Sequence, residues 1–430
     1  MKQIEITSFI FKQIDHLIEG GWKTLINKVK ILVDILINKI KPLKYLTFLP
    51  FIIMIRLISP IIIIRCGPLF SDRIGHFSAN TEIYYIEKFI LNKISNYKDI
   101  FFTRIPISNN QLLRMWKRNI QIETIAKYLY HCNRLIPGGN KHSISLVNYG
   151  DRDTNGLLSK YPNSIYFTKS EELTGEVYLK RKGLISNQKF VCFHNREDLY
   201  IKKLDAIAYR NNPKSKGSNK HDYRNSNINN SVDAIKMLSS KKYYIFRMGV
   251  LSKNKLNVIN SNIVDYANNG DRTEFLDIYL SSKCRFMVSD PSGIEATAMI
   301  FRKPIVHINM IPIEYASTYV NNCLFIPKLL WMKKTKSLMK FKDIYESGIG
   351  QFYHTKLYDN YGIEVIENSN DEIHDVVYEM ESRLNGSWMD DDYSISLQNK
   401  FWNDFPQSDL HGKIKARIGS AFLKKYNYLL

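Results

Sequence analysis

Arginine, histidine, serine and glycine recur at the ends of short apolar runs in the second half of the chain. His194 and Arg196 follow one such run, Arg247 ends a second, and Ser292-Gly293 follow a third. A guanidinium group can bind a phosphate through two parallel, charge-assisted hydrogen bonds. A small-residue turn before a helix adds backbone N–H donors and the positive end of the helix dipole. These residue types therefore indicate a site for a diphosphate.

Each of these signals has a simpler interpretation, which the sequence leaves open. The arginines could pair with nearby carboxylates, and Glu197, Asp198 and Asp265 stand close to them in the sequence. The segment around Ser292 could be an ordinary strand-to-helix turn, because small polar residues are common in the turns between helices and strands.

A second group of chemically capable residues lies upstream, in the segment 67–77, which we expect to be a loop. Arg73, Gly75 and His76 lie there, after the first convincing strand and before a helix. The unperturbed pKa of histidine is near neutrality, so His76 could act as a general base. Glu82, in the following helix, is the fallback base, with orientation or capping of the loop as its alternative role. A lone histidine is also often structural.

Metal and cofactor motifs are scarce. Asp151-Arg152-Asp153 has the D-x-D form used by some metal-dependent sugar transferases, but glycines on both sides favour a polar turn. There is no G-x-G-x-x-G fingerprint, no P-loop and no C-x-x-C. We therefore expect no metal and no cofactor.

The elements that must position these residues alternate between strands and helices, which predicts an α/β fold with a parallel sheet. Strand ends in one parallel sheet point the same way, so their polar residues should converge. The expected strands are 61–65, 99–103, 143–148, 190–193, 243–246, 264–266, 286–288 and 305–308. The expected helices are 45–59, 80–92, 111–130, 170–183, 231–239, 272–281 and 294–301, with further helices after 371.

Length and composition limit the number of domains and the kinds of binding partner. A chain of 430 residues with 44% hydrophobic content predicts two to three globular domains. The formal net charge of +20 suits nucleic acid, an anionic membrane or phosphorylated substrates, although a lysine-rich coding bias would give the same excess. Five scattered cysteines favour neither a zinc site nor a disulfide framework, and so indicate the reducing cytoplasm.

The first 60 residues read as a basic helical segment. The most apolar stretch here, 45–64, runs on into the first strand and is interrupted by Pro50, Arg56 and Pro60, which disfavours a membrane-spanning helix. Such a segment is typical of a helix at a membrane surface and equally of one that faces a core.

Several motifs carry a resemblance that covers most of the chain in order. They are FHNRED (193–198), DYRN (222–225), FRMG (246–249), DYA (265–267), FLDIYL (275–280) and SDPSGIEATAMIFRKPIVHIN (289–309), with IRCGPLFSDRIGHFSANTE (64–82) upstream. Together they resemble a family of bacterial surface-polysaccharide glycosyltransferases with GT-B architecture. The H-x-R element also resembles that of bacterial and protein fucosyltransferases, whose arginine contacts the donor diphosphate.

The resemblance implies two Rossmann-like domains facing a cleft. The expected divisions are a helical segment 1–60, an acceptor domain 61–185, a nucleotide-sugar domain 186–370 and C-terminal helices 371–430. With these motifs, the candidate donor-binding residues are His194, Arg196, Tyr223, Arg224, Asn225, Arg247, Asp277, Ser292, Gly293 and Glu295. His76 and Glu82 are the catalytic candidates, and Arg73 and Gly75 belong to the acceptor-side loop.

The expected function is metal-independent transfer of a sugar from a nucleotide-sugar to a surface-polysaccharide or lipid-linked glycan acceptor. The expected location is the cytoplasm, with the inner face of the membrane as an open alternative, and no nucleic-acid partner is expected. Two other functions stay open: a nucleotide-sugar epimerase or hydrolase on the same fold, because fold does not fix function, and a non-enzymatic polyanion-binding protein.

Overall fold

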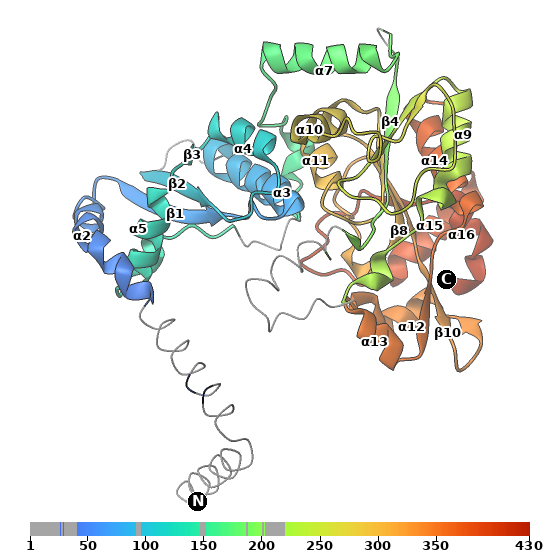
Figure 1. Ribbon diagram of the computed structural model, residues 1–430. Helices are drawn as coiled ribbons and strands as arrows, with labels where there is room; N and C mark the ends of the chain where they lie inside the picture. The colour runs from blue at the N-terminus through green and yellow to red at the C-terminus, as the bar shows by residue number, and fades with distance from the viewer. Residues whose placement is uncertain are drawn as a thin grey trace, which may run out of the picture. The chain divides into compact units, whose positions relative to one another are not determined.

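The computed structural model describes residues 26, 29, 41–91, 96–146, 152–185, 188–199, 202 and 220–430 (Figure 1). The chain divides into two compact units. The smaller unit comprises Met1–Pro68, Asn96–Phe102 and Gln121–Ile144, and the larger unit comprises Leu69–Ser95, Thr103–Ile120 and Ser145–Leu430.

The smaller unit is built on a three-stranded sheet of order β1-β2-β3. Helix α2 contributes Ile52 and Ile55 to its core, where they join Phe102 and Cys132. The elements are η1 (Lys41–Phe48), α2 (Leu49–Leu57), β1 (Ile63–Leu69), β2 (Tyr97–Thr103), β3 (Gln121–Ile122), α5 (Ile125–Arg134) and η3 (Gly139–His142).

The larger unit is organised around a seven-stranded sheet of order β13-β9-β8-β7-β4-β5-β6, and every neighbouring pair in it is parallel. A small sheet of order β11-β10-β12 is antiparallel. The strands are β4 (Phe190–His194), β5 (Tyr244–Met248), β6 (Ile263–Val264), β7 (Met287–Ser289), β8 (Ile305–Met310), β9 (Cys323–Pro327), β10 (Leu329–Met332), β11 (Ser337–Leu338), β12 (Ile363–Ile366) and β13 (Arg417–Ile418).

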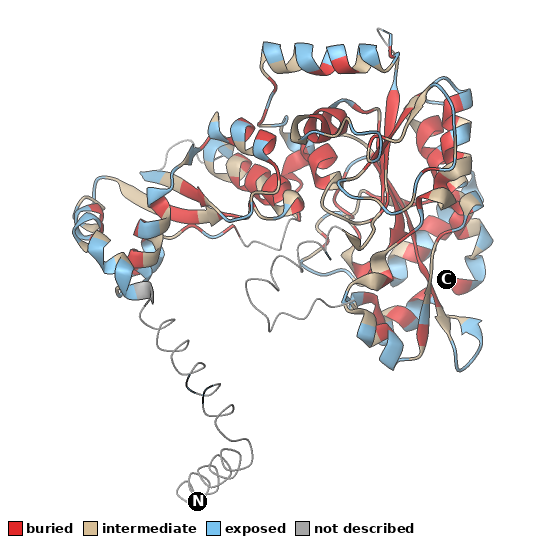
Figure 2. Ribbon diagram, in the orientation of Figure 1, coloured by how far each residue is buried: buried red, intermediate tan, exposed pale blue. Residues whose placement is uncertain are grey.

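Central strand β4 shows why this sheet forms. Successive side chains of a strand point to opposite faces. Val191 and Phe193 enter one apolar cluster, and Phe190 and Cys192 enter another on the opposite face. A strand covered on both faces reads as a continuous apolar run, as parallel sheets require. Figure 2 shows the resulting buried layer along the strands.

Helices surround this sheet and complete the larger unit (Figure 1). They are α3 (Ile74–Tyr85), η2 (Ile86–Leu91), α4 (Asn110–Lys117), α6 (Leu157–Lys160), α7 (Lys169–Arg181), η4 (Asp222–Arg224), η5 (Ile228–Ser231), α9 (Val232–Ser240), α10 (Glu274–Lys283), α11 (Glu295–Ile300), η6 (Ile313–Tyr315), α12 (Phe341–Glu346), η7 (Ile349–Gln351), α13 (Thr355–Asn360), α14 (Asn370–Leu384), α15 (Asp392–Asp404), α16 (Ser420–Lys425) and η8 (Asn427–Leu429).

The expected α/β class is confirmed, and three element predictions were wrong: the helix 111–130, the strand 143–148 and the loop 67–77. The single helix expected over 111–130 is two helices, α4 and α5, separated by β3, which pairs with β2 through Ile100 and Gln121. The break occurs because the two helices belong to different units, so their apolar faces pack into different cores. The expected strand 143–148 is reduced to one bridge, between Ser143 and Cys66, with 147–148 outside the described residues.

The expected loop 67–77 is largely regular structure. Strand β1 continues to Leu69, and α3 begins at Ile74. Gly75 and His76 therefore lie in the first turn of a helix. The proposed divisions at 60, 185 and 370 stay a prediction, and most of the segment 1–44 lies outside the described residues.

Two further properties bear on the setting of the protein. In the part of the chain that the structure describes, no helix has both the length and the apolar character needed to cross a bilayer. All five cysteines are buried and unpaired.

Candidate active site at the carboxyl edge of the sheet

The turn Asp290–Gly293 is the centre of the candidate site. It follows β7, and Ser289 at the end of that strand pairs with His194 at the end of β4. Each residue of the turn contacts a segment from elsewhere in the sequence. The expected convergence of polar groups at this edge is therefore present in the larger unit.

Asp290 is fully buried and fixes the geometry of the turn. Its Oδ2 accepts hydrogen bonds from the backbone N–H of Arg196, at 2.7 Å, and from the hydroxyl of Ser226, and its Oδ1 accepts one from the Asn309 amide at 2.9 Å. Burial raises the pKa of Asp290, while these three hydrogen bonds favour its ionised form. The carboxylate thus ties the loop after β4 to the turn after β7.

His194 is neutral at this edge. Burial and the positive charges of Arg247 and Arg196 lower its pKa to about 3. Its Nδ1 lies 3.2 Å from the hydroxyl of Ser289 and 3.3 Å from that of Ser292. The Ser289 hydroxyl also donates to the Asp290 carbonyl at 2.7 Å. The imidazole thus joins the end of β4 to the end of β7 and to the turn.

Arg196 and Arg224 are two adjacent cations that form no direct ion pair with a described carboxylate. Arg196 Nη1 donates to the His221 carbonyl at 3.0 Å and to Asn225 Oδ1 at 2.5 Å, and Arg224 Nη2 donates to the Pro291 carbonyl at 2.5 Å. Burial and the charge of Arg224 lower the pKa of Arg196 to about 10. Among the described residues, neither guanidinium forms an ion pair, and the buried Nε of Arg224 has no hydrogen-bond partner. The arrangement fits an anion that binds between them.

Arg247 pairs with carboxylates, which is the simpler interpretation that the sequence left open. Its side chain is 1% exposed and pairs with Glu197 at 3.2 Å and Asp265 at 3.4 Å. It also donates to Asn195 Oδ1 and to the Ser252 hydroxyl. These contacts give Arg247 a structural role. Donor binding by Arg247 stays a prediction.

The helix expected after Ser292 is shorter than predicted. Helix α11 spans Glu295–Ile300, and the Glu295 carboxyl group accepts both the Ser292 N–H, at 2.8 Å, and the Ser292 hydroxyl, at 2.9 Å. These donors are thus already used within the turn, and a six-residue helix contributes little dipole. Burial raises the pKa of Glu295 to about 8, so this carboxyl is largely protonated at neutral pH. The arginines, rather than the helix end, are the main candidate ligands of an anion.

Helix α3 meets this turn through two glycines of the larger unit. A Cβ added to Gly75 would come 3.0 Å from Gly293 Cα, so the two backbones are in direct contact. The adjacent His76 is half-buried, and its Nδ1 lies 3.1 Å from Asn80 Oδ1. Because the Asn80 amide nitrogen donates to the Leu146 carbonyl, its oxygen faces the imidazole and accepts from Nδ1. His76 Nε2 is thereby left as the nitrogen without a proton in the neutral ring, one residue along the chain from the Gly75–Gly293 contact.

The remaining upstream candidates are less suited to catalysis. Glu82 is fully buried, pairs with Arg302 at 2.7 Å and accepts from the Ser164 N–H at 3.1 Å. Burial raises its pKa. Arg73 is exposed and precedes the first turn of α3. For Glu82, this geometry favours the orienting role over proton transfer.

The other donor-binding candidates fall into two places. Tyr223 and Asn225 adjoin Arg224, and Tyr223 is buried with its ring 5.1 Å from that of Tyr358. Asp277 belongs to a separate network in α10, where it pairs with Arg272 at 2.6 Å and accepts from the Tyr266 hydroxyl at 3.0 Å. This network contains no residue of the turn Asp290–Gly293, so the donor-binding role of Asp277 stays a prediction.

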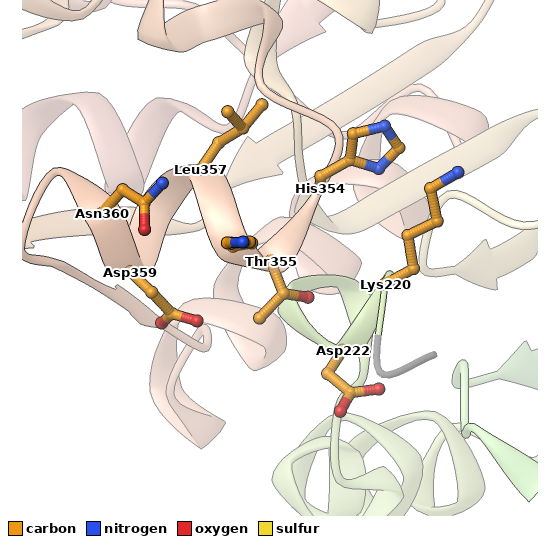
Figure 3. Close-up of a pocket in the computed structure, with 8 residues that line it drawn as sticks. Lys220, Asp222, His354, Thr355, Leu357, Asp359 and Asn360 are labelled. Atoms are coloured by element: carbon orange, nitrogen blue, oxygen red, sulfur yellow. The ribbon is translucent and has the colours of Figure 1, made fainter. Parts of the chain in front are cut away.

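An open cavity of about 750 Å³ lies beside η4 and α13 (Figure 3). Figure 3 shows Lys220 and Asp222 next to the start of α13, with His354 and Thr355. Asp222 also links the cavity to the arginines, since Asn225 donates to Asp222 Oδ1 at 3.4 Å and accepts from Arg196. The volume is within the range of small-molecule sites. The lining residues are Lys220, Asp222, His354, Thr355, Lys356, Leu357, Asp359 and Asn360.

The D-x-D motif is not arranged as a metal site in the residues described. Asp153 is buried and accepts the N–H groups of Leu157 and Leu158, both at 2.7 Å, so it caps α6. Asp151 lies outside the described residues. Across the described part of the chain, no three His, Cys, Asp or Glu side chains form a group that could hold a metal ion.

Comparison with known proteins gives distant structural likenesses. No protein-family model and no curated protein matches the sequence. The chain is similar to a glycosyl transferase family 9 structure from Veillonella parvula DSM 2008, with 10% identity, a TM-score of 0.40, and coverage of 68% of this chain and 90% of that one. It is also similar to E. coli ADP-heptose lps heptosyltransferase II (10% identity, TM-score 0.36, 62% and 91% covered). A third is the S. aureus MnaA-UDP co-structure (9% identity, TM-score 0.28, 76% and 98% covered).

Sequence reasoning missed three residues of this edge. Asp290 belongs to the motif 289–309, but from the sequence it was interpreted only as part of a polar turn. A carboxylate directly after a buried strand could have indicated a residue of the site. Asn80, which orients His76, looked like any polar residue at a helix start. Lys328 is buried and donates to the Asn225 carbonyl at 2.6 Å, a contact that no local pattern indicates.

Proposed function

We propose that the protein is a glycosyltransferase that uses a nucleotide-sugar donor. The observation that carries the proposal is the pair Arg196 and Arg224, two adjacent cations without carboxylate partners among the described residues. Two like charges held side by side without a direct ion pair are costly in a partly buried site, so their presence favours an anionic ligand. Ligands of open α/β sheets bind at the carboxyl ends of the strands, where these arginines lie.

In this proposal, the donor diphosphate lies between the two guanidinium groups. The bond between the anomeric carbon and the phosphate oxygen breaks, and the leaving diphosphate takes the electron pair. The arginines stabilise the negative charge that grows on it, which is a main source of catalysis at such sites. The cavity beside Asp222 offers space and polar groups for another part of the donor.

The acceptor in this proposal is a glycan or lipid-linked glycan. Its hydroxyl oxygen forms the new bond to the anomeric carbon, and its proton passes to His76 Nε2. The contact of Gly75 with Gly293 supports this role, because it brings the first turn of α3 to the candidate donor site. A lipid-linked acceptor would place the protein at a membrane surface.

The test is an assay of the purified protein against a panel of nucleotide-sugars, with and without glycan acceptors. The proposal predicts release of nucleoside diphosphate that depends on the acceptor. Turnover without an acceptor would instead indicate a hydrolase or an epimerase, and binding without any turnover would indicate a polyanion-binding protein.

A further inference from the structure

We propose that η1 and α2 of the smaller unit form a surface that docks onto an anionic lipid bilayer. This inference is independent of the proposed glycosyl transfer, because it concerns other residues and a different ligand. It rests on the apolar outer face of α2, on the aromatic side chains beside it and on the charge balance of the unit.

The outer face of α2 carries no polar side chain. Phe51, Ile53, Met54 and Leu57 are all exposed, and Leu57 retains 74% of its accessible surface. The opposite face holds the buried Ile52 and Ile55. Figure 2 shows this alternation of exposed and buried colour along α2. A short helix with one face in a core and the other apolar face in water resembles an interfacial helix.

The orientation of α2 is fixed within its unit. Arg56 Nη2 donates to Asn133 Oδ1 at 2.8 Å, and Arg56 Nη1 donates to the Pro137 carbonyl at 2.7 Å. Its charge is thus turned toward the unit's own backbone and away from the exposed face. Exposed apolar side chains also lie on both sides of the helix in the sequence: Ile61 follows it and is 78% exposed, and Leu43 of η1 precedes it and is 53% exposed.

Aromatic rings lie beside this surface. Phe48 is 6.2 Å from Phe51 and stacks on Tyr128 at 5.1 Å, and Tyr45 lies 5.9 Å from Tyr128. Aromatic rings with a polar tip prefer the boundary between lipid headgroups and acyl chains. Their position next to the apolar face is the arrangement expected at such a boundary.

The charge of the unit selects an anionic bilayer over a neutral one. Its acidic residues within the described ranges are Asp99 and Glu123, and Asp99 is paired with Arg65. Its basic residues in the same ranges are Lys41, Lys44, Arg56, Arg65, Lys98, Lys127, Arg134 and Lys141. An excess of this kind attracts a negatively charged lipid surface.

The experiment is vesicle sedimentation of the full-length protein on phosphatidylcholine with and without phosphatidylglycerol. Wild type should bind the anionic vesicles and bind the neutral ones weakly. The pair Met54→Glu with Leu57→Glu should lower the partition coefficient about tenfold or more, because it removes two apolar side chains and adds two like charges to the lipid. The matched control Ile259→Glu with Met389→Glu changes two equally apolar, exposed residues of the larger unit and should bind as wild type does.

Melting temperatures of all variants accompany the assay. A milder pair, Met54→Ser with Leu57→Ser, should show a smaller loss in the same direction and covers the event that the glutamate pair does not fold. Unchanged binding in both α2 pairs, or no binding by wild type, would overturn the proposal. Sedimentation velocity without lipid adds a second check: a dimer that the α2 pair converts to monomer would assign this face to a second copy of the chain and contradict lipid docking.

Discussion

The imidazole of His76 is the residue on which proton transfer depends in the proposed reaction. General-base catalysis typically contributes about 10²–10⁴-fold to the rate. His76→Ala should therefore lower turnover by that order and leave donor affinity and melting temperature near their wild-type values. The half-buried His374 of α14 offers a control of similar burial outside the candidate site, since His374→Ala should leave turnover and donor affinity unchanged. Equal losses of turnover and stability in His76→Ala would show that the imidazole only packs α3.

Arg247 and Arg196 should respond differently to removal, although both are arginines near strand ends. Arg247→Ala leaves the Glu197 carboxylate without its buried cation, which typically costs about 3–5 kcal/mol of unfolding free energy. Arg196→Ala removes hydrogen bonds to the His221 carbonyl and to Asn225 but no ion pair, so its cost should be smaller, about 1.5–3 kcal/mol. Urea unfolding of both variants measures the difference. A stable Arg247→Ala protein would return this residue to the list of donor ligands.

Glu295 should make the stability of the protein depend on pH. Burial raises its pKa from 4.5 to about 8, so the folded chain keeps a proton that the unfolded chain has released between these values. Its contribution is therefore fully present below about pH 4.5 and is lost as the pH rises toward 8. The melting temperature of wild type should fall more between pH 5 and pH 8 than that of Glu295→Gln. Parallel curves for the two proteins would refute this assignment.

At the scale of elements, the contact between α3 and the turn before α11 is the feature that joins the two candidate groups. An added Cβ at Gly75 would press on Gly293 Cα at 3.0 Å. Gly75→Ala should destabilise the fold by about 1–3 kcal/mol and displace His76 from the turn. Turnover should fall more than donor affinity. An alanine variant with wild-type stability and turnover would show that the close approach is dispensable.

The sequence predicted those elements whose pattern is local. The apolar run of β4 and the polar residues after it were readable, because a strand covered on both faces needs apolar side chains throughout. The start of α3 was not readable, because Gly75 looks like a loop residue until its contact with Gly293 is known. The break between α4 and α5 was missed for the same reason, since packing into separate units decides it.

The candidate site was predictable in position and less so in detail. Strand ends of a parallel sheet converge by rule, which brought His194, Arg196 and Ser292 together correctly. Which arginine is paired could not be decided from the sequence, because Glu197 is adjacent to Arg196 in the chain but pairs with the distant Arg247. The hydrogen bonds of Asp290 to Ser226 and Asn309 also join distant segments.

At the scale of the whole molecule, part of the net charge of +20 can be assigned to two specific regions. One is the pair Arg196 and Arg224 at the sheet edge of the larger unit, and the other is the excess of basic residues in the described ranges of the smaller unit. Both would attract anions, but of different kinds, a diphosphate and a lipid surface. The two can be tested separately because no residue is shared between them.

The most direct test of the central claim is calorimetric titration with a panel of nucleoside diphosphates. Wild type should bind at least one of them. Arg196→Ala and Arg224→Ala should each weaken that binding about ten- to a hundredfold, because each removes a charge-assisted contact. The exposed Arg114 of α4 provides the control, and Arg114→Ala should bind as wild type does. Wild-type affinity in both site variants, or no binding of any nucleoside diphosphate by the folded protein, would contradict the account.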